Sequence, residues 1–257
     1  MNIFIEGLQG SGKSTLVQKL SEKYPDYKPV REGDYSPVEL AWCAYVDKDQ
    51  YNEILEKYSN ISSMIQEKTT EENGKYIICY TQIITDIPGF HKDLEQYEIY
   101  NGRRSLEEFK EIVLGRYRNF TSDKNIFECS LLQNTVEDMI LYRAMSDEEI
   151  LDFYKEVGKI FEEKDMRLFY LKTEDIPGNI GIIRKERSDD KGNELWFPLM
   201  INYFNDSPYA KKFGLSGEDA LLNHLKHRQE LELRICEEIF GDKCTILKSK
   251  AYTDSDL

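Results

Sequence analysis

The sequence is poor in several features that define common classes of protein. Its five cysteines are never spaced as C-x-x-C, and its three histidines form no ligand set with them, so we expect neither a zinc site nor a disulfide framework. The longest apolar runs are far short of a membrane span, and the first residues lead into a predicted strand without a signal sequence. We therefore expect a cytoplasmic protein with no membrane partner.

Positive charge is scarce as well. The chain has 34 lysines and arginines against 48 aspartates and glutamates, a formal net charge of -14 at pH 7. Because such a surface repels a phosphate backbone, we expect no nucleic-acid polymer as a partner. Any phosphate group bound here has to be held locally, by a few well-placed groups.

The 257 residues also lack internal repeats and any linker rich in proline, glycine or serine. We therefore predict a single domain over residues 1–257, although a chain of this length could also form two small ones.

One segment, residues 7–15, fits the phosphate-binding loop pattern G-x-x-x-x-G-K-[ST] without a mismatch. In this pattern the glycines let backbone N–H groups point at phosphates, the lysine reaches the β- and γ-phosphates, and the hydroxyl after it is a ligand of Mg²⁺. Lys13 and Ser14 hold these two places. The residues expected to contact a nucleoside triphosphate are Gly7, Gln9, Gly10, Ser11, Gly12, Lys13, Ser14 and Thr15.

Strand and helix patterns alternate along the chain. The patterns predict strands over residues 2–6, 27–32, 125–130, 167–172 and 244–247, and an extended segment over 76–85. They predict helices over 37–46, 50–66, 106–120, 133–145, 147–164 and 217–240. With the phosphate-binding loop after the first strand, this order predicts an α/β fold with a doubly wound parallel sheet.

Charged residues at strand ends and in one short segment are further candidates for chemistry. Glu32 and Glu128 end two of the predicted strands, and ligands of open parallel sheets bind at the carboxyl ends of strands. Arg184 and Arg187 are three residues apart, so on a helix they share one face and could reach the same triphosphate. Plain surface charge is the alternative interpretation for Glu32, and surface pairing with glutamate is the alternative for the two arginines.

In order and spacing these features resemble the thymidylate kinase and deoxynucleoside kinase superfamily. The resemblance implies a phosphotransferase that uses ATP and Mg²⁺, with a nucleoside or nucleoside monophosphate as the small-molecule acceptor. It also implies a lid over about 176–195 that carries Arg184 and Arg187. By the same resemblance Glu32 is the base that faces the acceptor, and Glu128 lies with Ser14 on the metal side. Spacing alone leaves these two roles interchangeable.

The chain departs from that family in three places. It has Glu128-Cys129-Ser130 where the family shows Asp-Arg or Glu-Arg-Ser, it has Glu32-Gly33 where the family shows Glu-Pro, and it carries an insert over about 73–122. Another hydroxylated metabolite or an antibiotic therefore remains an alternative acceptor.

Two other functions fit parts of the sequence. A GTPase-type switch would use the D-x-x-G pattern of residues 86–89, but residues 175–178 match the same pattern and no [NT]-K-x-D follows for guanine. A nucleotide-binding protein without turnover would act through a partner. Whether two copies of the chain form a homodimer is left open.

Overall fold

The computed structural model describes all residues from 1 to 257. The chain divides into two compact units. The first unit contains Met1–Pro29 and Thr121–Leu257, and the second contains Val30–Phe120. The insert predicted over about 73–122 covers only the later part of the second unit, and the single domain stays a prediction.

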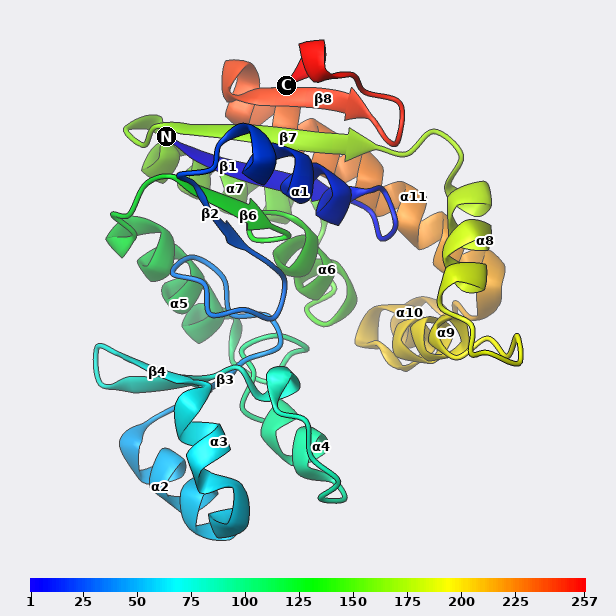
Figure 1. Cartoon of the computed structure of the whole chain (residues 1–257). Helices are drawn as coiled ribbons and strands as arrows, with labels where there is room; N and C mark the ends of the chain where they lie inside the picture. The colour runs from blue at the N-terminus through cyan, green and yellow to red at the C-terminus, as the bar shows by residue number, and fades with distance from the viewer. The chain divides into compact units, whose positions relative to one another are not determined.

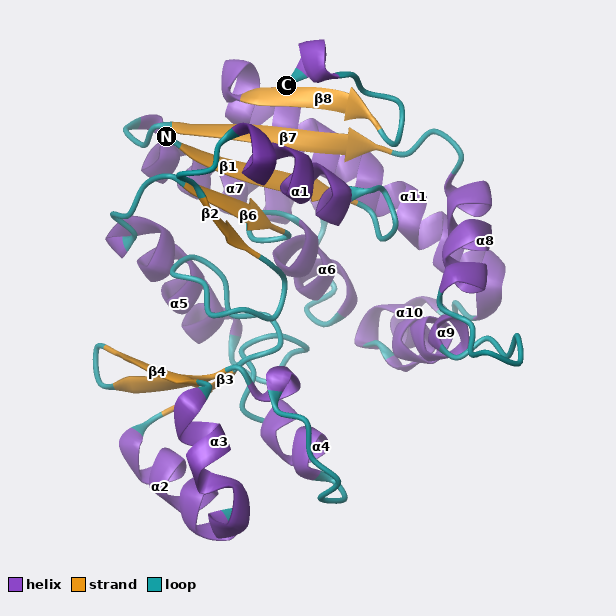
Figure 2. Ribbon diagram, viewed as in Figure 1, coloured by secondary structure: helices purple, strands orange, loops and turns teal.

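A five-stranded sheet forms the centre of the first unit (Figures 1 and 2). Its strand order is β2-β6-β1-β7-β8, and β2 reaches the boundary between the units. β1 pairs in parallel with β6 and with β7, and β7 pairs in parallel with β8. The strands are β1 (Asn2–Gly7), β2 (Lys28–Val30), β6 (Asn125–Glu128), β7 (Met166–Lys172) and β8 (Cys244–Lys248).

Helices of the first unit cover both faces of this sheet, with α1 on one face and α7 and α11 on the other, while α8, α9 and α10 lie beyond the ends of the strands (Figure 1). They are α1 (Lys13–Lys23), α6 (Gln133–Leu141), α7 (Asp147–Glu162), α8 (Ile176–Glu186), α9 (Trp196–Asp206), α10 (Pro208–Phe213) and α11 (Gly217–Ile235), with a π-helical turn over Cys236–Phe240 and 3₁₀ turns over Gly241–Lys243 and Asp254–Asp256. This arrangement confirms the predicted doubly wound parallel sheet. No helix in the chain has the length and apolar character that crossing a membrane requires.

Burial explains why β1 occupies the centre of the sheet. All six of its residues are buried, and Phe4 stacks on Phe127 of β6 with 4.9 Å between the ring centroids. Phe4 also meets the edge of Phe161 from α7. Because a strand buried on both faces has no solvent side, its sequence is nearly continuous in apolar residues. The end of β1, where the predicted phosphate-binding loop begins, is therefore held firmly.

The second unit has its own small sheet and its own core. Its strands β3, β5 and β4 lie in that order, and both pairings are antiparallel. Its elements are β3 (Ala44–Val46), α2 (Lys48–Lys57), a 3₁₀ turn (Ser59–Ile61), α3 (Ser62–Glu67), β4 (Thr69–Glu72), β5 (Lys75–Ile78), a second 3₁₀ turn (Tyr80–Gln82), α4 (Phe90–Glu95) and α5 (Leu106–Asn119). Buried residues from both the strands and the helices form one apolar cluster.

The structure contradicts part of the predicted secondary structure in the second unit. The helix expected over 37–46 is wrong, because this segment forms turns and then β3. Both carboxylate oxygens of Glu39 accept the backbone N–H of Ala41 at 2.7 Å, and Trp42 has a positive φ of 63°. These local bonds compete with a helix, and the apolar residues are buried in irregular structure instead. Within the extended segment predicted over 76–85, only the residues up to Ile78 form a strand, which is the end of β5.

Candidate active site

The predicted phosphate-binding loop follows β1 and ends where α1 begins, within the first unit. Its backbone requires glycine at two points. At Gly7 φ is 139°, and a Cβ would lie 2.7 Å from the carbonyl oxygen of Leu171. At Gly10 φ is 70°, and a Cβ would lie 2.1 Å from Cδ1 of Ile183. Both φ values favour glycine, and at Gly7 the backbone carbonyl leaves no room for a side chain, so the loop can curl and turn its N–H groups toward one anion.

Lys13 supplies the cation of the loop. Only 8% of the residue is exposed, and its Nζ donates to the carbonyl oxygens of Gly7 and Leu8, both at 2.8 Å. Both partners are neutral, and an ammonium group has three donors and no acceptor. A nearly buried cation of this kind is stabilised by an anion within reach, and a phosphate oxygen is such an anion.

Glu128 lies opposite the hydroxyl of Ser14. It ends β6, the strand beside β1, and its Oε1 accepts the Oγ–H of Ser14 at 2.5 Å. Mg²⁺ prefers oxygen ligands and usually combines one or two protein ligands with phosphate oxygens and water. No group of three or more His, Cys, Asp or Glu side chains in the chain could hold a metal ion by itself. The oxygens of Ser14 and Glu128 therefore fit a magnesium ion that arrives with a nucleotide.

The backbone turns sharply directly after Glu128. Cys129 has a φ of 57° and is 1% exposed, and its N–H continues the strand pairing by donating to Ile5 O at 3.1 Å. A non-glycine residue in this conformation costs energy, and such residues are frequent near functional sites. This buried thiol occupies the position at which the family pattern has an arginine.

Helix α8 and the segment after β8 hold the loop from outside. Asn179 of α8 donates from Nδ2 to the carbonyl oxygen of Gln9 at 2.9 Å, and its Oδ1 accepts Nζ of Lys250 at 2.9 Å. Ser249 donates from Oγ to the carbonyl oxygen of Ser11 at 2.8 Å. These bonds fix two carbonyl groups of the loop, so part of its shape is set before a ligand binds.

Arg184 and Arg187, the predicted lid arginines, both contact the segment that follows α8. Arg184 forms a two-pronged ion pair with Glu194 at 2.9 and 3.0 Å and a further bond to Glu218 at 2.9 Å. Its guanidinium group lies 4.2 Å from the centre of the Phe197 ring. Arg187 lies 4.8 Å from the centre of a tryptophan ring in the same segment. A lid role requires Arg184 to exchange these carboxylates for phosphate, and that role stays a prediction.

Glu32 lies in the second unit, just after β2. Its Oε1 accepts Nε1–H of Trp42 at 3.0 Å. Trp42 is 48% exposed and has a φ of 63°, an uncommon conformation for a bulky side chain. The exposed indole therefore holds a carboxylate at the surface of this unit. The role of Glu32 as a base stays a prediction.

The two D-x-x-G segments differ from what a GTPase-type switch requires. Asp86 lies in a loop eight residues after the end of β5 at Ile78, and it follows no strand of the parallel sheet. Asp175 caps the start of α8, where its Oδ1 accepts the N–H of Gly178 at 2.9 Å. Neither aspartate therefore ends a strand beside the phosphate-binding loop.

Glu6 is a fully buried carboxyl group directly before the loop. It is 0% exposed, and its two oxygens accept the backbone N–H groups of Leu131 at 2.7 Å and Gln133 at 3.0 Å. Burial, together with the nearby carboxylate of Glu232, raises the pKa of Glu6 to about 7, and the two backbone hydrogen bonds limit this rise. The group therefore changes charge close to neutral pH.

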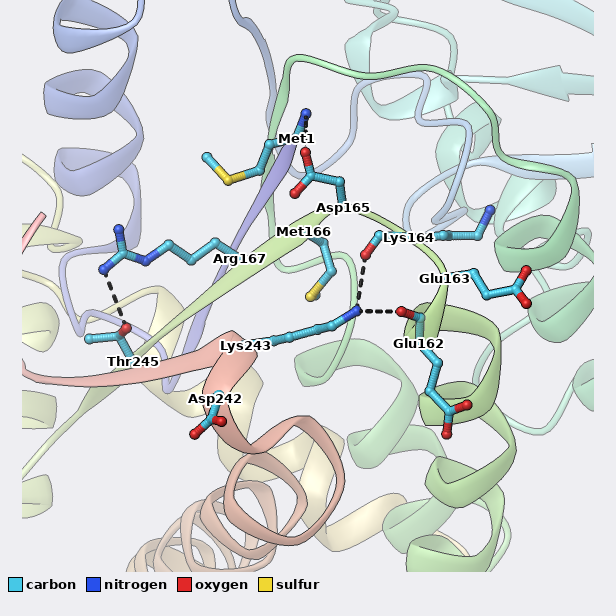
Figure 3. Close-up of a pocket in the computed structure, with 10 residues that line it drawn as sticks. All are labelled: Met1, Glu162, Glu163, Lys164, Asp165, Met166, Arg167, Asp242, Lys243 and Thr245. Atoms are coloured by element: carbon cyan, nitrogen blue, oxygen red, sulfur yellow. Dashed lines mark hydrogen bonds and ion pairs between the residues drawn. The ribbon is translucent and has the colours of Figure 1, made fainter.

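A second concave region lies at the other ends of the strands, beside Met1 and the start of β7 (Figure 3). This hollow has a volume of about 610 Å³. One of its two lysines, Lys243, donates to the carbonyl oxygens of Glu162 and Lys164 at 3.0 and 3.1 Å, where it caps the end of α7. The N-terminal amine pairs with Asp165 at 3.1 Å. These two cations thus serve the fold, and we place the candidate site at the loop.

Sequence reasoning missed several residues around the loop. Asn179 falls inside the predicted lid but belongs to no motif, and Ser249 and Lys250 follow the last predicted strand without a recognisable pattern. Lys250 has a φ of 60°, which the sequence does not reveal. Glu6 could have been noticed in the sequence, because it is a charged residue in an otherwise apolar run before the loop.

Glu6 should make the stability of the protein depend on pH. Its folded pKa lies above its ordinary value of 4.5, so its contribution is fully present below about pH 4.5 and is lost as the pH rises through about 7. The free-energy advantage of the wild type over Glu6→Gln should therefore fall by about 2 to 3 kcal/mol from pH 5 to pH 8, as measured by urea unfolding. Glu156→Gln, an exposed change on α7, is the control. Parallel curves for wild type and Glu6→Gln would contradict this assignment.

Comparisons with known structures give distant likenesses, and two of them are kinases by name. The chain is similar to a gluconokinase from Sinorhizobium meliloti 1021, with 11% identity, a TM-score of 0.34, and coverage of 98% of this chain and 83% of that chain. It is also similar to deoxyadenosine kinase from M. mycoides with bound dATP, with 14% identity, a TM-score of 0.40, and coverage of 100% and 95%. No protein-family model and no curated protein matches the sequence. Both structures are kinases by name, but at these TM-scores the likeness carries no argument about activity, so the function proposed below rests on the loop itself.

Proposed function

We propose that this protein is a phosphotransferase that moves the γ-phosphoryl group of ATP to a small-molecule acceptor in the presence of Mg²⁺. A nucleoside or nucleoside monophosphate is the favoured acceptor, and another hydroxylated metabolite or an antibiotic is the alternative. The observation that carries the proposal is the pairing of Ser14 with Glu128 at 2.5 Å beside the loop that holds Lys13. A cation, a hydroxyl and a carboxylate in this arrangement are what a nucleoside triphosphate with its metal requires.

In the proposed reaction a hydroxyl oxygen of the acceptor forms a bond to the γ-phosphorus. The bond between that phosphorus and the oxygen bridging to the β-phosphorus breaks, and ADP leaves. The hydroxyl proton passes to the carboxylate of Glu32, a role that follows from the family resemblance. Lys13 and the loop N–H groups balance negative charge on the phosphates. Bound Mg²⁺ would be held by Ser14 and Glu128 and would neutralise phosphate charge.

A GTPase-type switch is the less favoured function. Its D-x-x-G candidates occupy a loop of the second unit and a helix cap, and the chain has no [NT]-K-x-D for guanine. Localisation in the cytoplasm and pairing of two copies belong to the same proposal as expectations from the sequence.

Replacing the loop lysine tests the proposed function. Lys13→Ala should abolish detectable ADP formation from ATP, Mg²⁺ and a panel of acceptors, because phosphoryl transfer depends mainly on positioning and electrostatics. Lys19→Ala removes an exposed lysine from the same helix and should keep the activity. Circular dichroism and thermal unfolding check that both variants fold. Full activity in folded Lys13→Ala protein would defeat the proposal.

Replacing Glu128 and replacing Glu32 should have different effects on the reaction. Glu128→Gln should raise the Mg²⁺ concentration needed for half-maximal rate and slow ATP hydrolysis even without an acceptor, because it alters the metal side. Glu32→Gln should keep nucleotide and metal binding but lower kcat for transfer, with little change in the KM for ATP. Steady-state rates at varied Mg²⁺, ATP and acceptor separate these effects. If Glu32→Gln shifts the Mg²⁺ dependence and Glu128→Gln does not, the two roles are reversed.

A further inference from the structure

A fully buried arginine on α11 connects the phosphate-binding loop to the helices behind the sheet. Arg228 is 0% exposed. Its Nη2 donates to Oε1 of Gln9 at 2.8 Å, and its Nη1 donates to Oε2 of Glu137 in α6 at 2.9 Å. Its Nε lies 3.3 Å from Oε1 of Glu232, one turn further along α11. One guanidinium group therefore joins two helices to a side chain in the middle of the loop.

The carboxylates around Arg228 keep its charge balanced. Burial alone would raise the pKa of Glu137, but the charges of Arg228 and His224 outweigh burial and lower this pKa to about 2. Nε2 of His224 lies 2.9 Å from the same Glu137 oxygen, and the hydroxyl of Tyr170 donates to Glu232 at 2.6 Å. Glu137 thus stays ionised throughout the neutral range and holds the guanidinium group in one orientation.

Stability alone gives no reason for placing an arginine here. Removing two opposite charges from water costs about as much as their attraction returns, and well-packed apolar residues are often as stable or more so. A planar guanidinium group does offer five donors in a fixed fork, which a lysine or an apolar side chain cannot reproduce. The remaining arm of the guanidinium group contacts Gln9, and this contact orients the loop.

Gln9 is held at two points. Arg228 binds its side chain, and Asn179 of α8 binds its carbonyl oxygen at 2.9 Å. Gln9 is the residue directly before Gly10, whose positive φ of 70° begins the tight part of the loop. Because the side chain and the backbone carbonyl of Gln9 are both held, the loop is ordered before a nucleotide binds. Less conformational entropy is therefore lost on binding.

We propose that Arg228 is a positioning residue, which acts through Gln9 to hold the phosphate-binding loop in the shape that receives the triphosphate. It does not contact the nucleotide itself. This inference rests on the proposed function, because it assumes that the loop binds a nucleoside triphosphate.

The test compares Arg228→Lys with Gln9→Ala. Lysine keeps the positive charge between Glu137 and Glu232 but lacks the fork that reaches Gln9, and Gln9→Ala removes the same contact from the loop side. Each variant should weaken binding of ATP with Mg²⁺ about tenfold by isothermal titration calorimetry. The double variant should bind no more weakly than either single one, because both changes remove one interaction. Arg234→Lys, on the same helix but paired with Glu148 and Glu238, should bind as the wild type does.

Several results would overturn the inference. If folded Arg228→Lys protein binds ATP with wild-type affinity, Arg228 does not have this role. A loss of affinity of about a hundredfold in the double variant would also contradict the inference, because it would show that the two substitutions act independently. Thermal unfolding separates positioning from packing, because Gln9→Ala, a change at a half-buried loop residue, should weaken binding with little change in Tm. If Arg228→Lys does not fold, unchanged affinity in Gln9→Ala still contradicts the inference. A wild-type protein that binds no ATP refutes the proposed function, and this inference falls with it.

Discussion

The phosphate-binding loop keeps its shape because distant parts of the first unit bind its backbone from outside. Asn179 and Ser249 donate to the carbonyl oxygens of Gln9 and Ser11, and Gly7 lies against the end of β7 so closely that no side chain fits. With these carbonyls bound, part of the shape that receives an anion is set in advance. The candidate site therefore depends on contacts between residues far apart in the sequence.

Buried charge is the second constraint on the first unit. Glu6, Glu137, Glu232 and Arg228 all lie close to the start of the loop, and each is almost completely buried. Such groups are costly to remove from water, so each is bound: Glu6 by two backbone N–H groups, and the others by one another. Because the geometry of these bonds is specific, the helices behind the sheet have little freedom to shift relative to the loop.

The sequence predicted the centre of the first unit well for a physical reason. A buried strand, a glycine-rich loop and a helix follow one another within 23 residues, so local patterns determine them. The position of Glu128 beside the loop could be predicted because acids at strand ends meet at one edge of a parallel sheet. Arg228 could not, since its contact with Gln9 joins residues 219 positions apart and no local pattern records it.

The second unit was harder to predict, because its local sequence pattern and its conformation disagree. Its chain between Pro37 and Val46 has apolar residues at helical spacing, yet a local bond from Glu39 and the positive φ of Trp42 shape it into turns. Two helices of the first unit, α9 and α10, were also missed, although α10 begins with Ser207 as a cap and proline at its first position. The ion pair of Arg184 with Glu218 could not be predicted either, because it joins residues 34 positions apart.

The central claim is that the loop presents the γ-phosphoryl group of ATP for transfer. The most direct test follows that group with ATP labelled at the γ-phosphate, in the presence of Mg²⁺ and a panel of nucleosides, nucleoside monophosphates and hydroxylated antibiotics. The account predicts that the label appears covalently bound to one class of acceptor in amounts equal to the ADP formed. Label released only as free phosphate, independently of every acceptor, or no turnover at all would contradict it.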